Sequence, residues 1–224
     1  MSSMRTIRVT GKGQIKVRPD MTRITVSLEG THTEYGKTLR QSSEDTECLK
    51  DLLAEFGFER EDLKTLNFNV ETVYESYKVR DIYKRRFIGY KFRHMMKVEF
   101  ESDNTRLGKV LYALAHCPLK PEFQLSYTVK DPEAAKNELL GRAVTDATEK
   151  ADVLTRAAGV KLKGIQSIDY SWGQINFEVQ PMNRMLMTEE CCEPSIDGAG
   201  SYDIDIEPDD IMVSDTVAVI WEIE

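Results

Sequence analysis

Three histidines and four cysteines are the side chains of this 224-residue chain that are best suited to catalysis or metal binding. The histidines are His32, His94 and His116, and their spacing matches no motif for a catalytic zinc ion, which needs three protein ligands and an open position. His94 falls between Phe92 and Met96 on the apolar face of a predicted strand. We therefore interpret His94 as a hydrogen-bonded histidine of the core or of an interface.

The cysteines (Cys48, Cys117, Cys191 and Cys192) have neither disulfide-framework nor CxxC spacing, which predicts reduced thiols. His116 and Cys117 place an imidazole beside a thiol, but adjacent residues seldom face each other, and no orienting Asp or Asn can be assigned. We expect an ordinary helix end there. Neighbouring glutamates raise the pKa of the Cys191 and Cys192 thiols and lower their reactivity, although a redox or soft-metal role stays open.

Asp203, Asp205 and Glu207 could place three carboxylates on one face of an extended segment, and calcium prefers such oxygen ligands. The spacing and the turn glycine of an EF-hand are absent, so we interpret the segment as a solvated acidic loop. The sequence thus predicts no catalytic, cofactor-binding or metal-binding residues and no cofactor. We expect a protein that is not an enzyme.

Basic residues are concentrated between residues 78 and 97, whereas residues 189–210 hold nine acids. Tyr77, Tyr83 and Phe87 could stack on nucleic-acid bases, but a net charge of −8 repels a polyanion. We predict instead that the charges protect long edge strands from pairing or promote self-association. No nucleic-acid partner is expected. The basic residues are Lys78, Arg80, Lys84, Arg85, Arg86, Lys91, Arg93 and Lys97.

The elements that position these residues follow from apolar periodicity. It predicts the order strand, strand, helix, strand, strand, helix, strand, helix, strand, and then an irregular insertion over about 173–210 before a last strand. This order predicts an α+β fold with a mainly antiparallel sheet, three helices and a long central hairpin. Long irregular segments are usually functional or disordered, so we expect the insertion to be the least protected part.

The central hairpin joins strands over about 66–75 and 87–100. In its first strand Leu66, Phe68, Val70 and Tyr74 share one face, and we expect that face to lie in the core.

Small residues predict a close contact elsewhere in the chain. Gly11 and Gly13 lie on the covered face of the first strand, where a glycine lets another backbone approach. The helix that begins at Asp131-Pro132-Glu133 and stops at Gly159 has an alanine-lined face, which predicts close packing against a sheet.

Composition is that of an ordinary globular protein, with 30% charged and 41% hydrophobic residues, and we predict a single domain over residues 1–224. The first residues are polar and offer no apolar segment of a signal peptide, and no apolar run is long enough to span a membrane. We therefore expect a cytoplasmic location and no membrane partner.

With these parts in place, the chain resembles the SIMPL-domain family, a family of unknown function. The resemblance rests on Ile7-x-Val9-x-Gly11-x-Gly13 with Pro19-Asp20, Ile88-Gly89-Tyr90, Ala157-Ala158-Gly159-Val160, the strand Ile165–Trp172 and the closing strand Pro208–Glu224. Exported bacterial members look like envelope-associated proteins that assemble into large rings, and an animal member is linked to kinase signalling. The resemblance implies a self-assembling scaffold or adaptor, with its own copies and other proteins as partners. The alternative is a small-ligand or peptide binding protein with a pocket near the 173–210 insertion.

Overall fold

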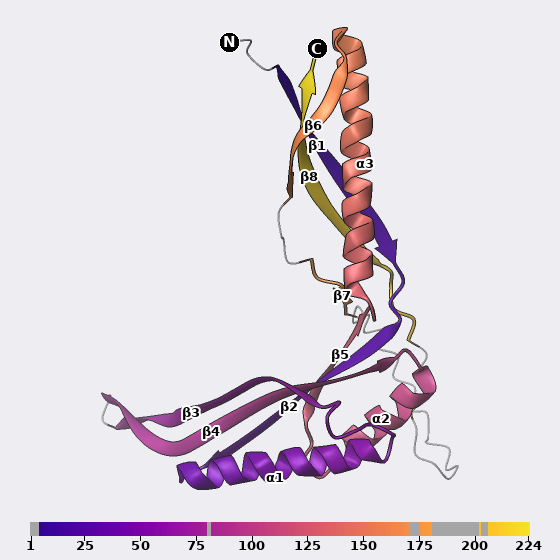
Figure 1. Cartoon of the computed structure of the whole chain (residues 1–224). Coiled ribbons are helices and arrows are strands. Elements are labelled where there is room, and N and C mark those ends of the chain that lie inside the picture. Colours follow the sequence, from indigo (N-terminus) through magenta and orange to yellow (C-terminus); the bar gives the residue numbers. More distant parts are fainter. Residues whose placement is uncertain (1–4, 80–81, 171–174, 181–201, 203–205) are drawn as a thin grey trace, which may run out of the picture. The chain divides into compact units, whose positions relative to one another are not determined.

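The structure is a computed structural model that describes residues 5–79, 82–170, 175–180, 202 and 206–224 (Figure 1). These residues form three helices and eight strands with antiparallel pairing, which confirms the predicted α+β class, the three helices and the long central hairpin. The elements are β1 Thr6–Val17, β2 Met21–His32, α1 Tyr35–Ala54, β3 Lys64–Val79, β4 Ile82–Glu101, α2 Asn104–His116, β5 Glu122–Thr128, α3 Pro132–Ala158, β6 Leu162–Tyr170, β7 Glu178–Val179 and β8 Ile211–Ile223.

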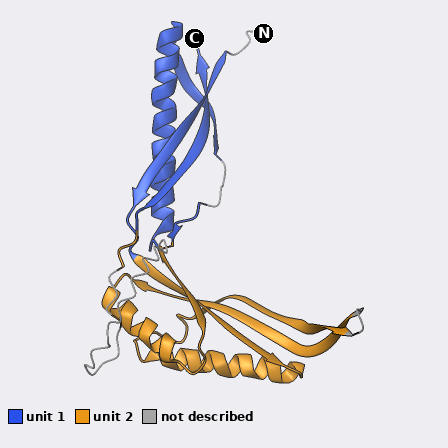
Figure 2. Cartoon of the chain, turned by 180° about the vertical axis from the view of Figure 1, so that it is seen from behind, with its two compact units in different colours: residues 1–20, 128–179, 209–224 blue, residues 21–127, 180–208 orange. Residues whose placement is uncertain are grey.

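Contacts group the chain into two compact units (Figure 2). Unit 1 contains residues 1–20, 128–179 and 209–224, and unit 2 contains residues 21–127 and 180–208. Since the chain passes between the units at four points, neither unit is one continuous stretch. The single domain over residues 1–224 stays a prediction.

Unit 1 is a three-stranded sheet in the order β1-β8-β6, with α3 lying along β1 and β8 (Figure 1). The first and last strands pair antiparallel along their whole length, from Thr6 opposite Glu222 to Val17 opposite Ile211. Val9, Val219 and Trp221 are buried with the alanines of α3.

The predicted contact of small residues is the closest packing in unit 1. A Cβ atom on Gly11 would lie 2.0 Å from the carbonyl oxygen of Ala143, and one on Gly13 would lie 2.2 Å from that of Leu139. Ala143 and Ala147 are fully buried on the facing side of α3. The backbone of the strand therefore packs directly against the backbone of the helix.

Both ends of α3 follow the sequence signals. The Asp131 side chain accepts a hydrogen bond from the N–H of Ala134 at 2.9 Å, and Pro132 takes the first helical position. Gly159 adopts a left-handed conformation with φ of 69° and donates its N–H to Arg156. The helix is thus held in length and register against the glycines of β1.

Part of the predicted irregular insertion is ordered against unit 1. Phe177 is buried with Ile15 and Leu139, and its carbonyl accepts a hydrogen bond from the Thr128 hydroxyl at 2.7 Å. The short strand β7 follows. Phe177 therefore packs on unit 1, and the weak protection expected for the insertion stays a prediction.

Unit 2 is built on the strands β3-β4-β2-β5. Helices α1 and α2 supply apolar side chains to one core with β2 and β4. Asp103 caps α2 by accepting hydrogen bonds from the N–H groups of Thr105 and Arg106. The buried core residues are Ile24, Val26, Leu28, Leu49, Leu53, Phe58, Leu63, Phe92, Met96, Val98, Phe100, Leu107, Val110, Leu111 and Leu114.

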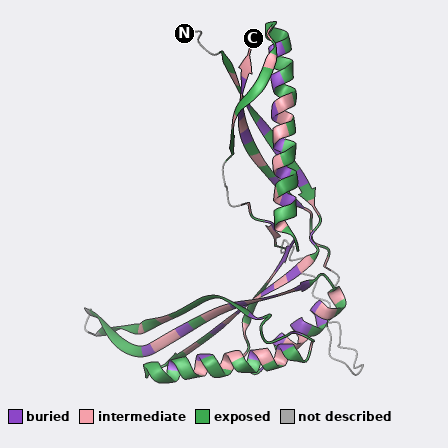
Figure 3. Ribbon diagram, viewed as in Figure 1, coloured by how far each residue is buried: buried purple, intermediate pink, exposed green. Residues whose placement is uncertain are grey.

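The prediction that the apolar face of β3 lies in the core is wrong for Leu66, Phe68 and Tyr74, whereas Val70 is partly buried and packs against the core. Phe68 is 44% exposed and Leu66 is 49% exposed, whereas Phe92 of β4 is completely buried. The reason is position in the sheet, because β3 is the edge strand and the helices cover β2 and β4 instead (Figure 3). Alternation alone does not tell a covered face from an exposed one.

Gly11→Ala is expected to destabilise the protein by roughly 1–3 kcal/mol or more, because the new methyl group would overlap backbone atoms that cannot move independently. Gly141→Ala on α3 is the matched control, since a Cβ there meets no atom within 4 Å. That change should stabilise by about 0.5–1 kcal/mol through helix propensity. Urea melts measure both, and equal effects would contradict the close strand–helix contact.

Phe92→Ala should cost about 3–5 kcal/mol, because it empties a fully buried site. Phe68→Ala should cost only about 1 kcal/mol, the loss of an edge-on ring contact with His94. Thermal or urea unfolding of the two variants measures the two losses of stability. A larger loss for Phe68 than for Phe92 would show that β3 is covered in solution.

Candidate functional site

His94 is held between two hydroxyl groups. Its Nδ1 lies 3.1 Å from the Thr46 hydroxyl of α1, and its Nε2 lies 2.9 Å from the Thr65 hydroxyl of β3. The Phe68 ring meets the imidazole edge-on at 5.1 Å. This confirms the interpretation of His94 as a hydrogen-bonded histidine. Both ring nitrogens are engaged, so the group is a structural link from α1 to the hairpin.

His116 and Cys117 occupy a helix end, as expected from the sequence. His116 is the last residue of α2, where its Nδ1 lies 2.8 Å from the Tyr112 carbonyl oxygen and its ring stacks on Tyr112 at 4.0 Å. Cys117 is the capping residue and is buried. The imidazole is engaged by its own helix and is not paired with the thiol.

Two groups of residues that the sequence analysis weighed as candidates and did not favour fall largely outside the described part of the chain. These are Cys191 with Cys192, and Asp203 with Asp205; Glu207, which is described, is exposed. Among the described residues, no three His, Cys, Asp or Glu side chains cluster in a way that could hold a metal ion.

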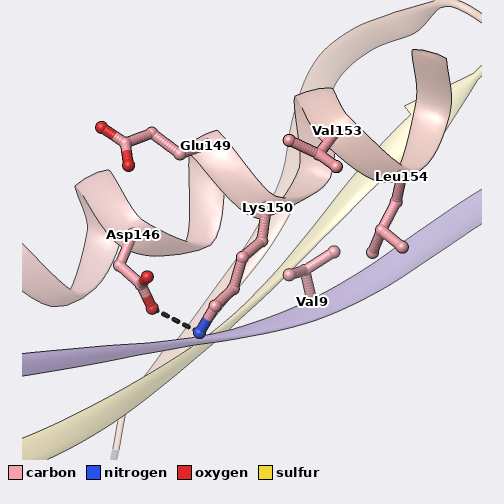
Figure 4. Close-up of a pocket in the computed structure, with 6 residues that line it drawn as sticks. All are labelled: Val9, Asp146, Glu149, Lys150, Val153 and Leu154. Atoms are coloured by element: carbon pink, nitrogen blue, oxygen red, sulfur yellow. Dashed lines mark hydrogen bonds and ion pairs between the residues drawn. The ribbon is translucent and has the colours of Figure 1, made fainter. Parts of the chain in front are cut away.

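A shallow groove of about 490 Å³ lies on unit 1 between α3 and β1 (Figure 4). Val9, Val153 and Leu154 form its apolar part, and Lys150 pairs with Asp146 at its edge, 2.6 Å apart. The groove contains no imidazole, thiol or hydroxyl group, and its ionisable side chains are Asp146, Glu149 and Lys150. It offers a largely apolar surface with an ion pair at its edge.

The same side of α3 covers the free edge of β1. Asp146 accepts the backbone N–H of Lys12 at 2.7 Å, and Arg142 donates to the carbonyl of Gln14 at 3.0 Å. Hydrogen bonds from Lys150 and from Lys12 lower the pKa of Asp146 and keep it ionised. The backbone N–H of Lys12 and the carbonyl of Gln14, which could otherwise pair with another strand, are therefore hydrogen-bonded within the chain.

The outer half of the β3–β4 hairpin has no such cover. The pairing of β2 with β4 ends at His32 opposite Tyr90, while β3 and β4 remain paired out to Val79 opposite Ile82. Residues 73–79 and 82–89 thus form a ribbon of two strands beyond the rest of the sheet, which we call the ribbon. Its described residues are exposed or half-buried, except that Gly89 is buried (Figure 3).

Aromatic side chains line the ribbon. Tyr83 is 76% exposed, Tyr74 is 45% exposed and Phe87 is 43% exposed. Tyr74 contacts Phe87 at 5.8 Å between ring centroids, and Phe87 contacts Tyr90 at 5.3 Å. Sequence reasoning assigned Tyr74 to the core, because an alternating apolar pattern is the same for a buried face and for an exposed contact face.

The basic residues of the hairpin are largely engaged within the sheet. Glu29 pairs with both Lys91 and Arg93, and the hydrogen bond from Lys91 is the main cause of its lowered pKa. Arg86 pairs with Glu75 at 2.7 Å. The Arg85 guanidinium lies 4.8 Å from the centre of the Tyr74 ring. Charge on this hairpin therefore links neighbouring strands, and its role in protection or self-association stays a prediction.

The fold and this surface define the class of the protein. It is an antiparallel α+β protein that exposes an aromatic ribbon. The chain belongs to the SIMPL family, described as proteins of unknown function (DUF541), whose sequence model matches residues 7–221. The resemblance noted from the sequence is confirmed.

Curated relatives include the 26 kDa periplasmic immunogenic proteins of Brucella melitensis and Brucella abortus, which are 27% and 26% identical over 163 residues. The match covers 72% of this chain, and it spans 65% of the length of each relative. Their names contradict the cytoplasmic location expected from the sequence. That expectation rested on the polar first residues, which do not determine where a protein resides. No helix among the described residues is long and apolar enough to span a bilayer.

The stability of the protein should fall as the pH is lowered below about 6.5, because of His94. Burial, and then the nearby Lys50, lower its pKa, so the fold favours the neutral ring. The contribution is present above the unfolded value of about 6.5 and is lost as the pH falls through the lower folded value. In His94→Gln, urea midpoints should change less over this range. An unchanged pH dependence in the variant would show that another group is responsible.

Proposed function

We propose that this protein is a non-enzymatic scaffold that self-associates in the periplasm and uses the ribbon as its contact surface. The observation that carries the proposal is the exposure of Tyr74, Tyr83 and Phe87 on two strands without further cover. The periplasmic location is taken from the names of the Brucella relatives.

A two-stranded ribbon is marginally stable alone in water, so one this long gains from being covered. Tyrosine, phenylalanine and arginine are also enriched in the centres of protein interfaces, and Arg85 and Arg86 flank these aromatics. Association through such a surface would bury aromatic area that supplies affinity. Exposed ion pairs are worth only about 0–1 kcal/mol each, so the charges would mainly select orientation.

The non-enzymatic part of the proposal has a separate basis. Among the described residues, the histidines at 94 and 116 are engaged in hydrogen bonds, and the groove on unit 1 has no imidazole or thiol. The alternative of a ligand pocket near residues 173–210 stays a prediction, because most of that segment lies outside the described residues.

The edge strand β6 is the competing surface for self-association. Ile165, Ile168 and Tyr170 are 52%, 44% and 42% exposed, and within the described residues β6 pairs with β8 and with no other strand. These side chains are as exposed as those of the ribbon. Variants of the two surfaces therefore form a matched pair.

Wild-type protein at tens of micromolar and about 0.1 M salt should scatter light as a species well above 25.6 kDa. Tyr74→Ser, Tyr83→Ser and Phe87→Ser together should weaken that species at least about tenfold, since a few aromatic side chains usually dominate an interface. Circular dichroism should report an unchanged fold. Ile165→Ser, Ile168→Ser and Tyr170→Ser together should leave the assembly intact.

Two results would overturn the proposal. A monomeric wild type under these conditions removes self-association altogether. If the β6 substitutions dissociate the assembly and the ribbon substitutions do not, the interface lies on unit 1.

A further inference from the structure

The backbone of β1 has a free edge, and α3 covers only part of it. The N–H of Lys12 and the carbonyl of Gln14 point to this edge, where side chains of α3 bind them. The carbonyl of Arg5 points the other way and accepts the N–H of Ile223, in line with the β1–β8 register. In an antiparallel pair this direction alternates from residue to residue. Even-numbered residues of β1 therefore direct their backbone groups to the free edge.

Arg8 and Thr10 are the even-numbered residues that α3 leaves open. β1 is the end strand in the order β1-β8-β6, and among the described residues no hydrogen bond reaches the backbone of Arg8 or Thr10 from the free side. Each of the two residues offers one N–H donor and one carbonyl acceptor. This stretch of the edge can therefore pair with a further strand.

The groove on unit 1 lies beside the same two residues. Val9, which stands between them, is 6% exposed and forms the floor of the groove, while Leu154 and Val153 of α3 are 50% and 63% exposed. The side chains of Val9 and Leu154 are directed toward each other (Figure 4). An open strand edge beside a pocket for side chains is the arrangement in which an extended peptide adds to a sheet.

The charges of the groove are not balanced. Asp146 is paired with Lys150 and accepts the N–H of Lys12. Glu149 also lines the groove, and it forms no ion pair or hydrogen bond within the part of the chain that the structure describes. The excess of negative charge favours a ligand that carries a cationic side chain.

We propose that this groove binds an extended segment of another polypeptide, which adds to the sheet as a strand beside β1. Its backbone hydrogen-bonds to Arg8 and Thr10, and a branched apolar side chain fills the groove against Val9 and Leu154. A lysine or arginine two positions away in the segment lies on the same face and pairs with Glu149. The site goes beyond the proposed self-association, because it lies on unit 1 and the ribbon lies on unit 2.

The backbone edge distinguishes such a segment from a compact apolar ligand. A compact ligand could cover Val9 and Leu154, but it would leave the donors and acceptors of Arg8 and Thr10 without partners. A strand meets both requirements at once, since its backbone pairs with the edge and its alternate side chains enter the groove.

The probe is a fluorescent peptide, acetyl-Ser-Lys-Thr-Val-Thr-Lys-Ser-amide, titrated with the full chain and followed by anisotropy. It reads the same in both directions, so it allows parallel or antiparallel addition to β1. We expect a Kd of about 10–500 µM. A peptide N-methylated at the three central residues keeps the side chains and loses the donors, and it should bind at least about tenfold more weakly. Replacement of both lysines by glutamate should also weaken binding.

Two matched pairs of protein variants locate the site. Leu154→Ser should weaken binding at least about fivefold, whereas Met212→Ser should not, since Met212 is 64% exposed but does not line the groove. Glu149→Gln should weaken binding of the lysine peptide, and Asp152→Asn on the same helix should leave it unchanged. The variant with serine at the three aromatic positions of the ribbon should bind like the wild type.

Hydrogen–deuterium exchange resolved to single residues tests the backbone contact. Without peptide, the amides of Arg8 and Thr10 should exchange faster than those of Ile7 and Val9, which point to β8. A saturating amount of peptide should slow Arg8 and Thr10 at least about tenfold and leave Ile7 and Val9 nearly unchanged.

Three results would overturn the proposal. The first is the absence of binding at about 1 mM peptide. The second is equal affinity for the N-methylated peptide, which would show that the backbone edge is not used. The third is strong protection of Arg8 and Thr10 without peptide, which would show that this chain or a second copy already covers the edge.

Discussion

The contact of a glycine-bearing strand with an alanine-lined helix is the constraint on which unit 1 depends. Because Gly11 and Gly13 carry no side chain, Ala143 and Ala147 of α3 lie directly against the backbone of β1. At this short separation, side chains of α3 also reach the free edge of β1. Asp146 and Arg142 satisfy Lys12 and Gln14 there. Close packing and edge protection are therefore two results of the same contact.

Unit 2 handles its edge in a different way. Its helices cover β2 and β4, and the edge strand β3 continues with β4 beyond the covered region. His94 links the base of this hairpin to α1, while ion pairs of Glu29 with Lys91 and Arg93 join β2 to β4. A hairpin anchored firmly at its base can present aromatic side chains at its outer half. The proposed contact surface lies on that outer half.

Sequence signals that act locally predicted the structure well. The covered glycines of β1, the start of α3 at Asp131-Pro132 and its end at Gly159 each follow from the geometry of one residue or one turn. The exposed face of β3 was assigned to the core because periodicity shows which residues share a face and not whether anything covers it. The cytoplasmic location expected from the sequence is contradicted by the names of the relatives, and these names carry information that the residues of this chain alone do not give.

Hydrogen–deuterium exchange at two protein concentrations tests the role of the ribbon most directly. Amides of residues 73–78 and 83–88 should exchange fast at about 1 µM and should become protected at about 100 µM, while the core strand β2 exchanges alike at both. This result is expected if copies of the chain cover the ribbon, because burial in an interface suppresses local opening. Equal exchange of the ribbon at both concentrations, in a sample whose mass has risen, would show that the protein assembles through another surface.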